Sequence, residues 1–201
     1  MRRKVITIIK AAQTEVTNNS SGFGLSGVGK NQVALLRKHF RENRKTFHFD
    51  LAASAPDICS LETCSQVLKG SLLKRVVYEQ LLDSGPEMKL NSEEILSKYK
   101  EFKINSPEIF NGYIKDNKIK SVFKSESVLR RVEFEIPEKN ILIVAKQRVV
   151  LSLLEWVLKN RIFNGIEGGL KMNLTDTGIS QIILTNKYCL MKEFDITPHL
   201  L

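Results

Sequence analysis

The sequence predicts an α/β fold, a three-layer α/β/α sandwich in which a mostly parallel sheet lies between two layers of helices. Residues 4–9 form a continuous, largely β-branched run, which is typical of a strand buried on both faces of a parallel sheet. Before residue 86 and after residue 135, short apolar runs alternate with segments of helical periodicity. With 201 residues, 42% of them hydrophobic, the chain is long enough to bury one substantial core.

The predicted elements follow one another in strand–helix order. After the first strand comes a polar loop with a breaker cluster over 18–22, and then Val33, Leu36 and Phe40 recur at helical spacing, which predicts a helix over 28–42. The next elements are a strand over 47–53, a helix over 60–68 and a strand over 74–78. The last elements are a strand over 141–145, a helix over 149–160, and two strands over 179–185 and 188–194 joined by a tight turn at Asn186-Lys187.

Residues 86–135 differ in character from both flanking parts. Asn91 with Glu94 is typical of a helix N-terminus, and lysines become frequent. We interpret this stretch as a cap inserted over one end of the sheet, within a single domain that spans residues 1–201.

Composition excludes several classes of protein. The longest apolar run of the C-terminal half, over 149–154, is far too short to cross a bilayer, and Lys10 interrupts the N-terminal run too early for a signal peptide. The three cysteines, Cys59, Cys64 and Cys189, show no metal-ligand spacing and are expected to be reduced thiols. We therefore expect a cytoplasmic protein with no membrane contact, no metal and no cofactor.

The net charge of +9 raises the hypothesis of nucleic-acid binding. The excess lies in the first part of the chain, where residues 1–85 hold 13 basic and 7 acidic residues, concentrated at Arg37-Lys38 and over 41–45. No recognised nucleic-acid motif accompanies these cations, so they are interpreted as the solvated face of a helix. On this basis nucleic acid is an unlikely partner.

Five segments of the chain carry a resemblance to one family. They are Lys10-Ala11-Ala12-Gln13-Thr14, Leu25-Ser26-Gly27-Val28-Gly29-Lys30-Asn31-Gln32, Ser54-Ala55-Pro56-Asp57-Ile58-Cys59-Ser60-Leu61-Glu62-Thr63, Ile141-Leu142-Ile143-Val144-Ala145-Lys146-Gln147-Arg148 and Thr197-Pro198-His199-Leu200. In order and spacing they resemble motifs of the histidine phosphatase (phosphoglycerate mutase-like) superfamily: Arg-His-Gly-Glu-Thr, Leu-Thr-x-x-Gly-x-x-Gln, Ser-Ser-Pro-x-x-Arg-x-x-x-Thr, Ser-His-Gly-Gly and a terminal His-Leu. The resemblance implies a phosphoglycerate mutase-like fold, with the insertion where the family keeps its variable cap.

The departures from the family fall on the residues that its chemistry uses. The resemblance puts Ala11 at the position of the nucleophilic histidine, Lys10 and Cys59 at the two phosphate-binding arginines, and Lys146 at the second pocket histidine. Phosphoryl transfer to the protein needs a nitrogen lone pair, which alanine lacks, and loss of a nucleophile costs on the order of 10⁴–10⁶ in rate. We therefore interpret the chain as a pseudoenzyme with no catalytic residue of the family kind. His39 and His48 are expected to be structural or solvent-facing.

The remodelled pocket is expected to bind a phosphate, a phosphorylated ligand or a protein partner. Ligands of such sheets lie at the carboxyl ends of the strands, where helix N-termini add backbone donors. The candidate anion-binding residues are Lys10, Gln13, Thr14, Ser54, Cys59, Lys146, Gln147 and Arg148.

Two alternatives remain open. The first is a weak phosphomonoesterase that uses non-standard residues, for instance Lys146 attacking as a neutral amine. The second is a nucleotide or nucleic-acid binder that works through the basic first helix and through residues 24–31, which nearly match the phosphate-loop pattern Gly-x₄-Gly-Lys-Ser/Thr. Asn31 stands where that pattern needs a hydroxyl, and the segment lies well beyond the first strand, and both features count against this alternative.

Overall fold

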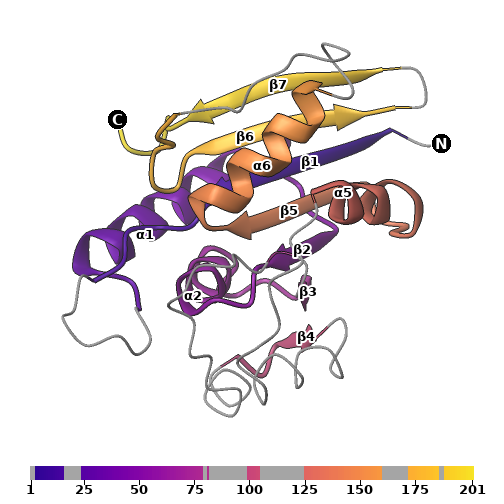
Figure 1. Cartoon of the computed structure of the whole chain (residues 1–201). Helices are drawn as coiled ribbons and strands as arrows, with labels where there is room; N and C mark the ends of the chain where they lie inside the picture. Colours follow the sequence, from indigo (N-terminus) through magenta and orange to yellow (C-terminus); the bar gives the residue numbers. More distant parts are fainter. Residues whose placement is uncertain are drawn as a thin grey trace, which may run out of the picture.

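The computed structural model describes residues 3–15, 24–78, 81, 99–104, 125–159, 172–185 and 188–201. Its strands form one sheet (Figure 1). Within these residues the sheet has seven strands in the order β4-β3-β2-β5-β1-β6-β7. The strands are β1 (Lys4–Lys10), β2 (Leu51–Ser54), β3 (Lys74–Val77), β4 (Phe102–Ile104), β5 (Asn140–Ala145), β6 (Ile179–Leu184) and β7 (Cys189–Ile196).

The sheet is mostly parallel, as predicted. β1 and β2 both pair in parallel with β5, and β2, β3 and β4 continue the parallel part of the sheet. β6 pairs antiparallel with β1 and with β7, so the sheet ends on one side in an antiparallel hairpin. The carboxyl ends of β1, β2 and β5 therefore meet at one edge of the sheet, which is where such folds bind ligands.

Helices cover both faces of this sheet. α1 (Gly27–Glu42) and α2 (Ile58–Val67) contact each other on one face, whereas α5 (Ser125–Phe134) and α6 (Gln147–Val157) contact each other on the opposite face. In Figure 1, α6 crosses in front of the strands and α1 passes behind them. The predicted three-layer sandwich is confirmed. Among the described residues no helix combines the length and the apolar character that a membrane span requires.

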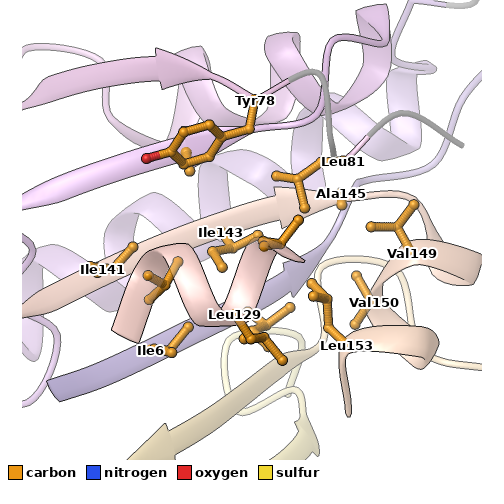
Figure 2. Close-up of a cluster of buried hydrophobic side chains, with 14 of the residues drawn as sticks. Ile6, Tyr78, Leu81, Leu129, Ile141, Ile143, Ala145, Val149, Val150 and Leu153 are labelled. Carbon is orange, nitrogen blue, oxygen red and sulfur yellow. The ribbon is translucent and has the colours of Figure 1, made fainter. Parts of the chain in front are cut away.

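Two buried clusters fix the layers because side chains of each strand alternate between the faces. On the α5/α6 side, Ile6, Ile143 and Leu153 are fully buried together with Leu129 of α5 (Figure 2). On the α1/α2 side, the cluster includes the fully buried Leu36 of α1 with Leu61 of α2 and Val144 of β5. The strand-to-strand register therefore determines which helix each side chain meets.

The helices of the α1/α2 layer begin at side-chain caps. The Ser26 hydroxyl accepts a hydrogen bond from the backbone N–H of Gly29 at 2.9 Å, and the Asp57 carboxylate accepts one from Ser60 N–H at 3.0 Å. The two caps lie two and three residues before the predicted helix starts, so the observed helices begin slightly earlier than the apolar periodicity alone indicated.

The second strand begins later than predicted. Residues 47–50 precede β2 and form no strand, because the backbone N–H of Phe47 donates to Asn43 O in the turn that ends α1. The Phe47 ring packs on Phe40, with centroids 4.8 Å apart. The predicted strand over 47–53 is therefore wrong in its first half, since the apolar Phe47 is buried by a turn and not by strand pairing.

Two described parts of residues 86–135 belong to the main layers. β4 extends the sheet beside β3, and α5 contributes Val128, Leu129 and Val132 to the core. The rest of the predicted cap, including Asn91 and Glu94, lies outside the described residues, as do the breaker cluster over 18–22 and the turn at 186–187. The single-domain assignment stays a prediction.

The C-terminal segment is fastened to the core by His199. Its ring is buried, its Nε2 lies 2.8 Å from Thr177 Oγ1, and its centroid lies 6.1 Å from that of His39 on α1. Burial, with a smaller contribution from the neighbouring His39, lowers the pKa of His199 from 6.5 to about 4. The imidazole ring of His199 is therefore neutral in the folded protein at neutral pH, and it gains a proton only at a lower pH than in the unfolded chain.

Shortening a core leucine tests the packing of α6 against the sheet. Leu153→Ala removes a side chain that is 0% exposed and should lower the free energy of unfolding by about 2–5 kcal/mol in urea denaturation. Leu35→Ala on α1, where the leucine is 44% exposed, is the matched control and should change it by less than about 0.5 kcal/mol. Equal losses in both variants would contradict this core.

Acid should destabilise the protein partly through His199. The unfolded chain binds a proton near pH 6.5, but the folded chain binds it only near pH 4, so the free energy of unfolding falls as pH drops between these values. When the pH falls from 6.5 to 4, the free energy of unfolding should decrease by roughly 1–3 kcal/mol less in His199→Gln than in the unmodified protein. Urea denaturation at several pH values measures the difference, and identical pH profiles would exclude this role for His199.

Candidate functional site

A cavity of about 680 Å³ opens at the carboxyl ends of β1 and β5. Residues 10–14, at the end of β1 and in the loop after it, and residues 146–148, at the start of α6, supply most of its wall, and Cys59 of α2 supplies another part. This is the edge of the sheet at which the sequence analysis predicted a ligand site.

Seven of the eight predicted candidates line this cavity. They are Lys10, Gln13, Thr14, Cys59, Lys146, Gln147 and Arg148. Ser54 does not line it, because the side chain is fully buried at the end of β2 and its hydroxyl donates to Ala55 O at 2.9 Å. The prediction missed Leu151, one helical turn beyond Gln147, and Asp176, which comes from a loop far along the chain.

Ala11 and Ala12 close the inner wall of the cavity. Their side chains are 4% and 3% exposed, and the backbone N–H groups donate to Ala145 O and to Thr63 Oγ1. The position that the sequence resemblance assigns to the nucleophile therefore presents a methyl group, and its backbone donor is already used in the sheet.

Asp176 holds the first cation of the cavity. Lys10 Nζ lies 2.9 Å from Asp176 Oδ1 and donates to Leu174 O at 2.6 Å. The backbone fixes this approach, because Thr177 N–H donates to Lys10 O and Lys10 N–H donates to Gly178 O. The charge of Lys10 is thus compensated by a neighbouring carboxylate, which weakens its attraction for an incoming anion.

The thiol of Cys59 is held in its protonated, unreactive form. Its Sγ donates to Asp57 Oδ1 at 2.8 Å, and the same carboxylate caps α2 and accepts from the Ser60 hydroxyl at 2.7 Å. Burial first, and then the Asp57 charge, raise the pKa of Cys59 well above its ordinary value. Because the thiolate is the reactive form, this cysteine is neither a nucleophile nor a fixed cation.

The N-terminus of α6 faces the cavity without a side-chain cap. Lys146 occupies the capping position in an extended conformation and makes no capping hydrogen bond, and the first turn holds no acidic residue. The Gln147 side chain points instead toward Asn173 Oδ1, at 3.3 Å. Uncapped backbone N–H groups and the positive end of the helix dipole favour an anion here, beside the Lys146 and Arg148 side chains.

The phosphate-loop-like segment packs under the wall of the cavity. A Cβ at Gly29 would lie 2.1 Å from Gln13 O, so only glycine permits this approach of α1 to the loop after β1. The N–H groups of Ser26, Gly29 and Lys30 all donate within the protein, and the exposed Lys30 does not line the cavity. These three backbone donors are therefore engaged within the protein and are not available to a nucleotide phosphate.

All three histidines of the sequence are described, and none lines the cavity. His39 lies in the last turn of α1, His199 is buried beside it, and His48 is exposed and pairs with Asp50 at 3.2 Å. The described part of the chain also holds no group of three His, Cys, Asp or Glu residues that could bind a metal ion. The cavity thus combines cations, amides and a helix N-terminus, a donor set suited to an anion.

Comparison with known proteins relates the chain to others through structure alone. No model of a protein family and no curated protein matches the sequence. Similar solved structures include the phosphoglycerate mutase of Bacillus anthracis, with a TM-score of 0.65 and 14% identity over 98% of this chain and 95% of that one. The α-ribazole phosphatase of Shigella flexneri is similar with a TM-score of 0.64 and 15% identity over 96% of each chain.

A third similar structure is that of a phosphoserine phosphatase mutant from Entamoeba histolytica, in which a histidine is replaced by alanine, in complex with phosphoserine. It has a TM-score of 0.58 and 18% identity over 98% of this chain and 100% of that one. The similarity extends over nearly the full length in each case. The chain therefore has the phosphoglycerate mutase-like fold that phosphatases and mutases of the histidine phosphatase superfamily share.

Proposed function

We propose that this protein is a catalytically inactive relative of the histidine phosphatases that binds a phosphorylated ligand in the cavity at the ends of β1 and β5. One observation carries the proposal. The cavity lies at the carboxyl ends of β1 and β5 and has cations in its wall, but Ala11 lines it at the position that the sequence resemblance assigns to the nucleophile, and none of the three histidines lines it.

The binding half of the proposal depends on the anion-attracting groups of the cavity. Lys146 and Arg148 line it at the uncapped start of α6, where the helix dipole adds partial positive charge. Lys10 is close by but shares its charge with Asp176. A phosphoryl group would therefore lie nearer to Lys146 and Arg148 than to Lys10, since the Asp176 carboxylate repels it on that side.

The inactive half depends on the absence of an activated nucleophile. The family reaction passes through a phosphorylated histidine, and a methyl group at Ala11 cannot form that bond. The Cys59 thiol remains protonated and bonded to Asp57, so it offers no replacement. The remaining cavity groups can position a phosphoryl group and neutralise its charge, which stabilises a ligand without cleaving it.

A protein of the same fold supports the proposal that a phosphorylated ligand can bind although an alanine replaces a histidine. The Entamoeba histolytica phosphoserine phosphatase mutant has a histidine replaced by alanine and still holds phosphoserine. In that protein, binding of a phosphomonoester therefore survives the loss of a histidine. The cavity of the present chain is likewise lined by an alanine, Ala11.

Hydrolysis measurements separate this proposal from the weak phosphomonoesterase. We expect the purified protein to release phosphate from a panel of phosphomonoesters no faster than the buffer does, and Lys146→Ala to behave in the same way. Turnover by the unmodified protein that disappears in Lys146→Ala would overturn the inactive assignment and make Lys146 part of a different mechanism.

Phosphate should stabilise the folded protein by binding in the cavity, and the stabilisation grows with the logarithm of the phosphate concentration once that exceeds the dissociation constant. Saturation to roughly 100 times the dissociation constant stabilises by about 2.7 kcal/mol, visible as a rise in the thermal midpoint. The double variant Lys146→Ala/Arg148→Ala should lose most of this rise, whereas Asp176→Asn should enlarge it because the charge of Lys10 is no longer compensated.

Lys30→Ala is the matched control for this experiment. It removes one exposed lysine outside the cavity and should leave the phosphate-dependent shift unchanged. A shift that is the same in all four proteins would show that phosphate acts as a general salt, and the binding proposal would then fail.

A further inference from the structure

A second concave surface lies at the opposite end of the sheet. It is a groove of about 570 Å³ between the C-terminal ends of α1 and α2 and the segment that leads into β2. Its basic and aromatic lining includes Arg37, Arg41, Arg44, Lys69, His48 and Phe49. We call this surface the basic groove.

The cations of the basic groove have no protein partner among the described residues. No ion pair or side-chain hydrogen bond engages Arg37, Arg41, Arg44 or Lys69 there, and no Asp or Glu lines the groove. The carboxylate nearest in sequence, Glu42, follows Arg41 but pairs with Lys38 at 3.9 Å. The next one, Asp50, pairs with His48 and accepts from the backbone of Asn140. Four uncompensated cations around one concavity favour an anionic occupant.

The arginines form a row along the groove. Arg37 and Arg41 are four residues apart on α1, which places them on the same helix face and roughly 6 Å apart along its axis. Arg44 follows just beyond the helix end and lines the same groove. Such a row suits an extended chain that carries a negative charge on each unit, and exceeds what a single small anion needs.

Aromatic rings stand beside this row. Phe40, Phe47 and Phe49 belong to the apolar part of the groove, and Phe40 and Phe49 are in edge-on contact at 5.2 Å between centroids. Phe49 is only partly buried, and the His48 side chain is 71% exposed. The exposed His48 ring and the partly exposed Phe49 ring thus lie next to arginines, and unpaired bases stack on such rings while their phosphates bind cations.

The positive surface continues beyond the groove. A further cavity of about 600 Å³ begins at Lys45, the residue after Arg44, and its other cations are Arg3, Lys139 and Lys192. No Asp or Glu lines it among the described residues, although Lys192 is shared with Glu193 at 3.7 Å. A ligand longer than one unit could therefore extend along the same side of the molecule.

We propose that the basic groove binds single-stranded nucleic acid, with phosphates on the Arg37-Arg41-Arg44 row and bases stacked on His48 and Phe49. The sequence alone made nucleic acid an unlikely partner, because no recognised nucleic-acid motif accompanies the basic cluster. The turn after α1 brings residues 47–49 back beside Arg37 and Arg41, which creates the combination in space. An acidic peptide would use the cations but has no bases to stack on the rings.

Fluorescence anisotropy of a labelled single-stranded oligonucleotide of about 12 nucleotides, within the site sizes of such proteins, tests the proposal. Arg41→Gln/Arg44→Gln should weaken binding about tenfold or more and reduce the slope of log affinity against log salt by about 1.4. Lys30→Gln/Lys38→Gln removes the same charge from α1 outside the groove and should change affinity less than about twofold. His48→Ala should weaken binding at least about fivefold with little change in salt slope.

Three results would overturn the proposal: no binding at low salt, equal losses in the two double variants, or displacement of the oligonucleotide by poly-glutamate as effective as by unlabelled oligonucleotide. Thermal melting of each variant checks that the fold is kept, as expected for partly or fully exposed side chains. Lys146→Ala should bind the oligonucleotide unchanged, so this test is independent of the phosphate site proposed above.

Discussion

The parallel pairing of β1 with β5 is the constraint on which the rest of the molecule depends. It runs from Val5 opposite Asn140 to Lys10 opposite Ala145, and Ala11 N–H extends it by donating to Ala145 O. Both strands are covered on both faces, so their backbone groups have no solvent to bind and must pair with each other. This pairing joins the first part of the chain to the last and places the loop after β1 beside the start of α6.

The same strand also anchors the α5/α6 layer at its other end. Lys4 is buried at the start of β1, and its ammonium donates to the carbonyls of Val132 and Ile136 at the end of α5. Burial lowers the pKa of Lys4, and the charges of Glu138 and Glu133 oppose that effect. A buried lysine is tolerated here because helix-end carbonyls and nearby carboxylates replace its water.

The two surfaces proposed for binding differ in how the protein treats its own charges. At the cavity, Lys10 is compensated by Asp176 and Cys59 is bonded to Asp57, so the protein itself neutralises or blocks part of the candidate site. At the basic groove, Arg37, Arg41 and Arg44 have no such partner among the described residues. Within the described residues, the groove at the amino ends of the parallel strands therefore has a cationic lining that no carboxylate compensates.

The sequence by itself determined the fold class, most strands and helices, and seven of the eight residues assigned to the cavity. These features depend on local periodicity and on the rule that loops after parallel strands share one edge, and both can be read along the chain. Tertiary structure alone decided that Asp176 meets Lys10, that Ser54 turns away, and that β4 and α5 join the main layers. It also decided that His48 and Phe49 face the arginines of α1. Each of these results depends on contacts between residues distant in the sequence or on the path of a turn, and side-chain periodicity carries no information about either.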